Sequence, residues 1–194
     1  MTVSQHIRQL QQALMYAQPA IDTAAHWGRV LADLLPGGRR LLVAGSGGSA
    51  AQAQHLVTQI VGLHREDREP YSAMSVLAET SSLTAIADDY GVGAMYARHV
   101  RAHGREGDVA IVMSISGRSR NMLAAAHAAH DIGLRVWAMT GPMPNPLTEL
   151  ADDALTIDAP QTATVQELHL VAVEVLCTEF DAALRSRGLA GAVK

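Results

Sequence analysis

Four short apolar runs, each bounded by turn-forming residues, constrain the fold of this chain more than any other feature of its sequence. They are LLVAG at 41–45, VAIVMS at 109–114, VWAMTG at 136–141 and ALTID at 154–158. Continuous apolar runs of this length are typical of strands that are buried on both faces of a parallel sheet. Because helix-length segments separate the runs, the sequence predicts an α/β fold in which helices cover both faces of the sheet.

The segments between the runs carry apolar residues at helical spacing. The predicted helices cover 49–62, 79–104 with a break near Gly91, 119–132 and 164–187. Residues 3–35 show the same spacing and predict an amino-terminal pair of helices broken near Pro19. Three prolines and a glycine at 141–146 predict a loop.

Length and composition favour one domain. A chain of 194 residues, 48% of them hydrophobic, has enough apolar surface for one core. We expect a single domain over 1–194, with the helical pair in 1–38 and the α/β sandwich in 39–188. Cys177 is the only cysteine, which excludes an internal disulfide, and its apolar surroundings predict a buried thiol.

Charge and hydropathy exclude several kinds of partner. The formal net charge is −4, no block of like charges occurs, and aromatic residues make up only 4% of the chain, so a nucleic-acid surface is not expected. The amino terminus lacks a signal-peptide pattern, and no apolar stretch approaches the ~18 residues of a membrane span. We therefore expect no membrane contact and a cytoplasmic location.

The first chemical signal is the glycine-rich stretch AGSGGSAAQAQH at 44–55, which joins a strand to a helix that opens at about Ser49. Such a turn lets backbone amides and the positive end of the helix dipole approach an anion. Gly45, Gly47 and Ala50 also fit the dinucleotide pattern G-x-G-x-x-G/A. A phosphate site and a nicotinamide-binding site are both open at this point.

The second signal is SISGRSRN at 114–121, which again lies between a strand and a helix. Ser114, Ser116 and Ser119 supply three hydroxyls beside exposed backbone amides, enough to surround a phosphate without lysine or metal. The alternative is an ordinary turn with helix-capping serines. Two such loops in one sheet favour the phosphate site, because a dinucleotide domain needs only the first.

The order of GSGGSA, LTAIADDYG, SISGRS, MTG and QELH over residues 40–180 resembles the phosphoheptose isomerase branch of the sugar isomerase (SIS) proteins. The resemblance implies a parallel three-layer α/β sandwich of the flavodoxin and Rossmann type. It also implies a homotetramer with active sites between subunits. Active members interconvert sedoheptulose 7-phosphate and a heptose 7-phosphate, often with zinc.

The resemblance also implies the residues that bind substrate. The phosphate would be held by the loop Ser114, Ile115, Ser116 and Ser119. The sugar would be lined by Ser46, Gly47, Gly48, Ser49, Asp88 and Asp89.

Four further residues fall at the catalytic and metal-binding positions of the family. His55 and Gln166 match a metal-ligand histidine and glutamine, whereas Gln59 stands where active members have a glutamate that serves as base and ligand. Glu174 stands where they have a second catalytic histidine. All four are candidate catalytic residues and candidate zinc ligands, although glutamine is a weak zinc ligand. Ala163 and Leu63 also replace an expected aspartate and arginine.

Glu174 is also a candidate independently of the family resemblance, since it alone interrupts the apolar stretch LVAVEVLC. A carboxylate on a buried helix face is costly unless it is paired, so the stretch predicts a buried carboxylate with a role in the site. His169, one turn beyond Gln166, is a reserve candidate. The other histidines have no supporting pattern and are expected to be ordinary helix or surface residues: His6, His26, His64, His99, His103, His127 and His130.

Two hypotheses for function follow. In the first, the chain is an aldose–ketose isomerase with altered catalytic residues, in which Glu174 is a relocated base, His55 is an acid or ligand, and Gln59 and Gln166 orient the substrate or metal. In the second, it is a non-catalytic phosphosugar-binding protein that acts through a partner, like the DnaA initiator-associating SIS protein, which it also resembles. A nicotinamide-dependent oxidoreductase is disfavoured because no acidic residue clearly ends a second strand.

Overall fold

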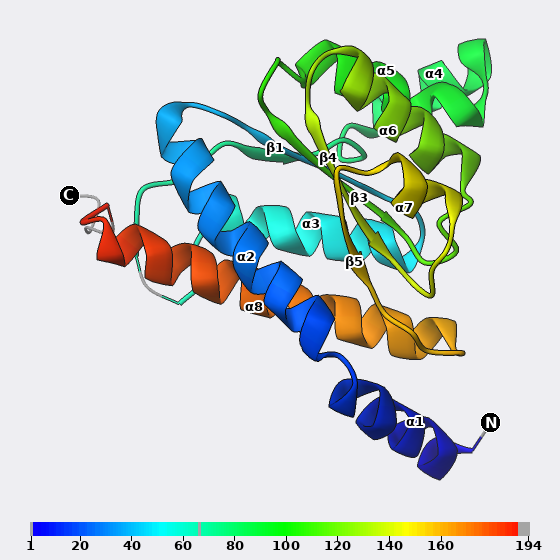
Figure 1. Cartoon of the computed structure of the whole chain (residues 1–194). Helices are drawn as coiled ribbons and strands as arrows, with labels where there is room; N and C mark the ends of the chain where they lie inside the picture. Colours follow the sequence, from blue (N-terminus) through cyan, green and yellow to red (C-terminus); the bar gives the residue numbers. More distant parts are fainter. Residues whose placement is uncertain (1, 66, 190–194) are drawn as a thin grey trace.

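A computed structural model describes residues 2–65 and 67–189 and shows a parallel sheet between two layers of helices (Figure 1). Within these residues the sheet has five strands in the order β2-β1-β3-β4-β5, and every neighbouring pair is parallel. The strands are β1 Leu41–Gly45, β2 Ala73–Ser75, β3 Val109–Ser114, β4 Arg135–Thr140 and β5 Asp153–Thr156. The three-layer sandwich predicted from the sequence is confirmed.

The α-helices of the described residues are α1 Val3–Met15, α2 Gln18–Leu34, α3 Gly48–Val61, α4 Thr80–Tyr90, α5 Met95–His103, α6 Arg120–Asp131, α7 Pro146–Leu150 and α8 Thr162–Ser186. Helices α2, α3 and α8 cover one face of the sheet, and α4 to α7 cover the other. Helix α1 extends beyond this body and contacts the start of α8, where His6 Nε2 lies 2.8 Å from a Glu167 oxygen. None of the helices within residues 2–65 and 67–189 is long and apolar enough to cross a membrane.

The strands are buried on both faces because alternate side chains enter two different cores. In β1, Leu41 and Val43 pack toward α2, α3 and α8, whereas Leu42 and Ala44 pack toward the opposite layer. All five residues of β1 are buried. This double burial explains why the sequence shows continuous apolar runs rather than alternation.

Two elements were not predicted from the sequence. Strand β2 is only three residues long and pairs at the edge of the sheet with β1, so it carries too few residues to form an apolar run. Helix α7 begins at Pro146, the last residue of the predicted loop. The Asn145 side chain accepts a hydrogen bond from the Thr148 amide at 3.1 Å, which caps this short helix, and a proline is tolerated in the first turn.

The predicted breaks in the helical segments are confirmed. Helix α1 ends at Met15, and Pro19 lies in the first turn of α2, where its missing amide hydrogen costs no helical bond. Gly91 ends α4 with a φ of +84°, a conformation that side chains other than glycine rarely adopt.

Helix α2 is held closely against α8 and the sheet. A Cβ atom at Gly28 would overlap the Leu176 carbonyl oxygen, so glycine permits the two helices to approach. The indole of Trp27 stacks on Trp137 with ring centroids 4.8 Å apart and donates a 2.7 Å hydrogen bond to Asp153. These contacts fix the face of the sheet on which α8 lies.

Two α8 side chains belong to the core. Cys177 is buried, as predicted, and burial raises the pKa of its thiol. His169, the reserve candidate for the site, is fully buried, and its Nε2 donates a 3.0 Å hydrogen bond to the Thr140 carbonyl oxygen. Burial lowers the pKa of His169 to about 4, so the ring is neutral and links α8 to the end of β4.

A buried ion pair anchors the segment between α3 and β2. Arg68 donates from Nε to Asp181 of α8 at 2.8 Å, and the two side chains are 2% and 6% exposed. Its remaining donors bond the carbonyl oxygens of Gln59 and Ile60 in the last turns of α3. Arg68 therefore closes the carboxyl end of α3 and ties it to α8.

We expect Asp181→Ala to destabilise the fold strongly, because it leaves the Arg68 guanidinium buried without its counter-charge. The expected loss is about 3–5 kcal/mol in the free energy of unfolding, measured by denaturant titration. Asp131→Ala is the matched control, since the Arg101–Asp131 pair is 50% and 59% exposed and should contribute at most about 1 kcal/mol. Equal effects at the two positions would contradict the structural role of Arg68.

The buried His169 predicts a loss of stability in mild acid. Between its ordinary pKa of 6.5 and its lowered value of about 4, the unfolded chain binds a proton that the folded chain does not. Stability should therefore fall as the pH falls through this window, by up to about 1.4 kcal/mol per pH unit from this group. Denaturation curves of wild type and His169→Gln should diverge over this range; parallel pH profiles would refute the assignment.

Candidate active site

A cavity of about 630 Å³ lies at the carboxyl ends of β1 and β3, where the two predicted loops meet. The first loop contributes Ser46, Gly47, Gly48 and Ser49, and the second contributes Ser114, Ile115, Ser116 and Ser119. The start of α8, including Gln166, completes the wall. The structure thus brings together all eight loop residues that the sequence assigned to phosphate and sugar binding, along with Gln166.

The first loop turns sharply from β1 into α3. Gly47 has a φ of +59°, and a Cβ atom at Gly45 would overlap the backbone of Ser49, so both positions require glycine. Helix α3 begins at Gly48 with no side-chain cap. Its first amides are therefore free to donate to an anion in the cavity.

The second loop presents hydroxyl groups to the same cavity. Ser114 donates a 3.1 Å hydrogen bond to the Ser119 hydroxyl, and Ser119 occupies the N-cap of α6 without a side-chain capping bond. Gly117 turns the loop with a φ of +61°, and a Cβ atom there would overlap the Asn145 side chain. The Ser119 side chain therefore makes no capping bond to α6, unlike the capping serines of the alternative, an ordinary turn.

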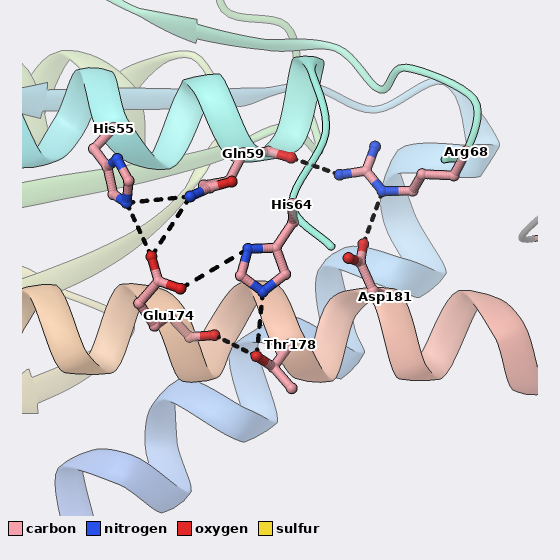
Figure 2. A network of polar contacts seen from close by, with 7 residues as sticks. All are labelled: His55, Gln59, His64, Arg68, Glu174, Thr178 and Asp181. Atoms are coloured by element: carbon pink, nitrogen blue, oxygen red, sulfur yellow. Dashed lines mark hydrogen bonds and ion pairs between the residues drawn. The ribbon is translucent and has the colours of Figure 1, made fainter. Parts of the chain in front are cut away.

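A second group of polar residues lies between α3 and α8 (Figure 2). His55 Nε2 is 3.0 Å from Glu174 Oε1, and Gln59 Nε2 is 3.2 Å from the same nitrogen and 3.5 Å from the same oxygen. An ionised carboxylate can only accept, so His55 donates to Glu174. The structure brings His55, Gln59 and Glu174 together, as their predicted shared site requires.

The predicted burial of Glu174 is wrong for this chain. Its side chain is 42% exposed, and that of His55 is 38% exposed. The neighbours Ala172, Val173 and Leu176 are buried in the core, whereas Glu174 faces the junction with α3 (Figure 2). The carboxylate is therefore paired with an imidazole and also open to solvent.

Gln166 connects the cavity to this group. Its side-chain amide packs against Gly48, where an added Cβ atom would overlap this amide. The backbone carbonyl oxygen of Gln166 accepts a hydrogen bond from the Gln52 side chain. Gln166 and Glu174 are two turns apart on α8, which separates them by about 12 Å. We call the line Gly48, Gln52, His55, Gln59, Gln166 and Glu174 the polar seam; it leads from the cavity to the paired carboxylate.

Asp88 and Asp89 are not brought to the cavity. Both are exposed near the end of α4, in the helical layer on the opposite side of the sheet from α3 and α8. Their predicted place beside the sugar stays a prediction, because the resemblance implies a site between subunits and the structure describes one chain. The sequence places LTAIADDYG between the two loops but does not show on which side of the sheet it packs.

His64 is a member of the group that sequence reasoning missed. It follows α3, its side chain is 2% exposed, and its Nδ1 lies 3.9 Å from Glu174 Oε2 (Figure 2). No periodic pattern marks it, because its position depends on how the segment after α3 folds back over α8. The expectation that it is an ordinary surface residue is wrong.

The residues present fit a zinc ion poorly. His55 and Glu174 are two suitable donors, while Gln59 and Gln166 offer only neutral amides. Among the described residues, no group of three or more histidine, cysteine, aspartate and glutamate side chains could hold a metal ion. The chemistry considered below therefore uses only the side chains of the chain.

Comparison with known proteins agrees with this architecture. The SIS domain profile matches residues 4–141. A phosphoheptose isomerase of Streptomyces coelicolor is 56% identical over 187 residues, which cover 96% of this chain and 80% of that protein. A phosphoheptose isomerase of Rhodospirillum rubrum is 39% identical over 168 residues, covering 87% and 88% of the two chains.

Solved structures agree at the level of the whole fold. A phosphoheptose isomerase from Neisseria gonorrhoeae superposes with a TM-score of 0.85 at 32% identity, covering 93% of this chain and 97% of its own. One from Francisella tularensis gives a TM-score of 0.86 at 30% identity, with coverage of 94% and 100%. With its paired serine and glycine loops at the same sheet edge, the chain belongs to the SIS domain family, in the branch of the phosphoheptose isomerases.

Proposed function

We propose that this protein is an aldose–ketose isomerase that interconverts sedoheptulose 7-phosphate and a heptose 7-phosphate. The observation that carries the proposal is the polar seam, which joins an anion-binding cavity to the His55–Glu174 pair. An extended heptose phosphate is comparable in length to the ~12 Å between Gln166 and Glu174 along α8. The names of the related isomerases support the same substrate class.

The cavity binds the phosphate end of the substrate in this proposal. The serine hydroxyls of the second loop donate to phosphate oxygens, and the free first-turn amides of α3 and α6 add partial positive charge. Gln166, at the wall of the cavity, orients the sugar hydroxyls. Binding the non-reacting end in this way positions the carbonyl end along the seam.

The His55–Glu174 pair transfers protons at the carbonyl end. Glu174 removes the proton from the carbon beside the carbonyl, and the bonding electrons form an enediolate. As Glu174 takes up this proton, the Nε2 hydrogen of His55, which Glu174 accepts in the free site, turns to the oxygen on which negative charge develops, and Gln59 adds an amide donor. Glu174 then returns its proton to the neighbouring carbon while the hydroxyl proton passes to the other oxygen, so atoms and charge balance.

Three expectations extend this proposal. A homotetramer would allow Asp88 and Asp89 of one subunit to reach the cavity of another, which one chain does not achieve. Zinc, where bound, would have His55 and Glu174 as its candidate ligands, and no step of the proposed proton transfer depends on it. A location in the cytoplasm would give access to sugar phosphates.

A non-catalytic phosphosugar-binding protein is the second candidate. Gln59 supports it, because this neutral amide occupies the position at which the resemblance implies a catalytic glutamate. In that case the serine loops would bind a phosphosugar and the surface would bind a partner protein. The two candidates differ in one measurable property, which is turnover.

We expect Glu174→Gln to lose on the order of 100-fold to 10,000-fold in kcat, because an amide cannot accept the proton. The assay follows aldose formation from sedoheptulose 7-phosphate by NMR, with and without zinc. Glu179→Gln, on the same helix but paired with Arg29 of α2, away from the seam, is the matched control and should keep full activity. Wild-type turnover that survives in Glu174→Gln would refute the role of the base, and absent wild-type turnover with saturable phosphosugar binding would favour the second candidate.

We expect Gly48→Ala to impair substrate binding while the protein still folds. The added Cβ would displace the Gln166 side-chain amide, which is the flexible end of its side chain. Misplacing Gln166 should raise KM or lower kcat, by up to about 100-fold in kcat/KM. Gly37→Ala is the control, since its Cβ would meet no atom within 4 Å; equal kinetics for the two variants would show that Gln166 is not a substrate-orienting residue.

A further inference from the structure

We propose that Asn145 is a positioning residue that fixes the shape of the second loop, residues 114–119, and thereby the affinity of the cavity for a phosphate group. The proposal rests on the phosphate-binding role proposed above for this loop. Asn145 lies between β4 and α7, and only 3% of its surface is exposed. We call the segment 141–145, which ends at Asn145, the β4–α7 loop.

The hydrogen bonds of Asn145 use its whole side-chain amide. Oδ1 accepts from the Thr148 amide at 3.1 Å and caps α7. Nδ2 donates to the Thr140 hydroxyl at 3.1 Å and to the Pro142 carbonyl oxygen at 3.2 Å. The Thr140 hydroxyl donates its own hydrogen to the Gly141 carbonyl oxygen, so toward Asn145 it can only accept. These bonds fix both the position of the side chain and the direction of its amide.

The fixed amide lies directly against the second loop. Gly117, at the turn of that loop, has a φ of +61°, and an added Cβ atom there would overlap the Asn145 side chain. Two backbone hydrogen bonds flank this contact. The Gly141 amide donates to the Ile115 carbonyl oxygen at 2.9 Å. The Leu147 amide, in the first turn of α7, donates to the Gly117 carbonyl oxygen at 3.1 Å. The second loop is therefore held at three points.

The bonds to the two carbonyl oxygens determine where the other side of each peptide unit points. In a trans peptide the C=O and N–H groups point in opposite directions, so the amides of Ser116 and Arg118 are turned away from the β4–α7 loop. The Arg118 amide donates to the Ser116 hydroxyl oxygen at 3.2 Å. Among the described residues the hydrogen of that hydroxyl has no acceptor, so it can donate to a ligand in the cavity that Ser116 lines.

The Ser119 hydroxyl is arranged in the same way. It accepts from the Ser114 hydroxyl at 3.1 Å, so its own hydrogen can also serve the cavity. Ser114 is the register partner of Thr140 in the neighbouring strands β3 and β4 (Figure 1). Thr140 accepts from Asn145 through its hydroxyl and from His169 of α8 through its carbonyl oxygen. Asn145 thus links the second loop to the end of β4 and, through Thr140, to α8.

Loss of the Asn145 side chain would free the part of the second loop that can move most. It would leave space beside Gly117, whose backbone has the widest conformational freedom in that loop. The hydroxyls of Ser116 and Ser119, on either side of Gly117, would then lose their fixed separation. An anion binds preformed donors at little cost in ordering, so a loop that must be ordered on binding should bind phosphate more weakly.

Asn145→Ser separates the positioning role from the capping of α7. Serine is about as good an N-cap as asparagine, but its side chain is too short to reach Thr140 and to fill the space beside Gly117. We expect the variant to fold and to bind inorganic phosphate about 10-fold to 100-fold more weakly, measured by ³¹P NMR titration. In the isomerase assay KM should rise by a similar factor, with kcat changed less.

Thr148→Val is the matched control. The Thr148 hydroxyl accepts from the Asn145 backbone amide at 3.2 Å and donates to the Asn145 carbonyl oxygen at 2.8 Å. Its removal weakens the start of α7 but leaves every bond of the Asn145 side chain in place. We expect this variant to melt at a lower temperature without weaker phosphate binding. Equal weakening of phosphate binding in both variants would overturn the proposal, because only the stability of α7 would then matter.

A double-mutant cycle tests whether Asn145 acts through the second loop. Ser116→Ala removes one of the donors that Asn145 positions. In this background Asn145→Ser should cost less phosphate affinity than it does in wild type, because the two residues share one effect. Fully additive losses would overturn the positioning role.

The phosphate titration also separates this proposal from the isomerase function. Affinity that falls in Asn145→Ser while wild type shows no turnover would support the positioning role and contradict the isomerase. Unchanged affinity in Asn145→Ser, with wild-type turnover intact, would overturn the role of Asn145 alone. Wild type that binds no phosphate would overturn both.

Discussion

The parallel course of α3 and α8 over one face of the sheet is the constraint on which the site depends. Both helices begin at the cavity, α3 at Gly48 and α8 at Thr162, and both lead away from it in the same direction. Their amino-terminal ends therefore border the same cavity, while their facing side chains form the polar seam. Without this alignment the phosphate cavity and the carboxylate would be unrelated features of the surface.

Burial is distributed unevenly along the seam. Near the end of α3, the Arg68–Asp181 pair is almost completely enclosed, whereas Glu174 and His55 are about two-fifths exposed. A buried ion pair specifies one geometry but cannot exchange protons with a substrate, whereas a half-exposed carboxylate can meet one. The rigid pair and the accessible pair lie two turns apart on α8, so the first can define the position of the second.

Local sequence patterns predicted most of the strands and helices, and they identified the loop residues that line the cavity. The runs at 41–45 and 109–114 match β1 and β3 because double burial leaves a clear apolar signature. Strand β2 was not predicted because its three edge residues are too few to show a hydrophobic pattern. Helix α7 was not predicted because the prolines around it indicate a loop, and the sequence does not show that Asn145 caps a helix there. The residues of the two loops were identified because their glycines and serines directly follow an apolar strand and precede a helix.

The errors concern relations between segments. The burial of Glu174 was predicted from its neighbours in sequence, but exposure depends on which side of α8 faces α3. Asp88 and Asp89 were assigned to a sugar site between subunits, which one chain does not test; within the chain, α4 packs on the other face of the sheet. His64 gave no signal, since its contact with Glu174 depends on the path of the segment that Arg68 anchors. Such relations depend on how distant segments pack together, and they produce no periodic pattern in the amino-acid sequence.

The alignment of α3 and α8 also bears on the proposed move of the base. Gln59 and Glu174 lie on facing helices with their side chains 3.5 Å apart, so a carboxylate on either helix would reach nearly the same point in the seam. Exchanging acid and amide across this gap would preserve one carboxylate, one amide and the neighbouring His55. What the exchange would alter is the surroundings of the carboxylate, because on α8 it lies 3.9 Å from Nδ1 of His64, on the segment after α3. On this argument a glutamine at position 59 is by itself weak evidence against catalysis, because Glu174 supplies a carboxylate at nearly the same point of the seam.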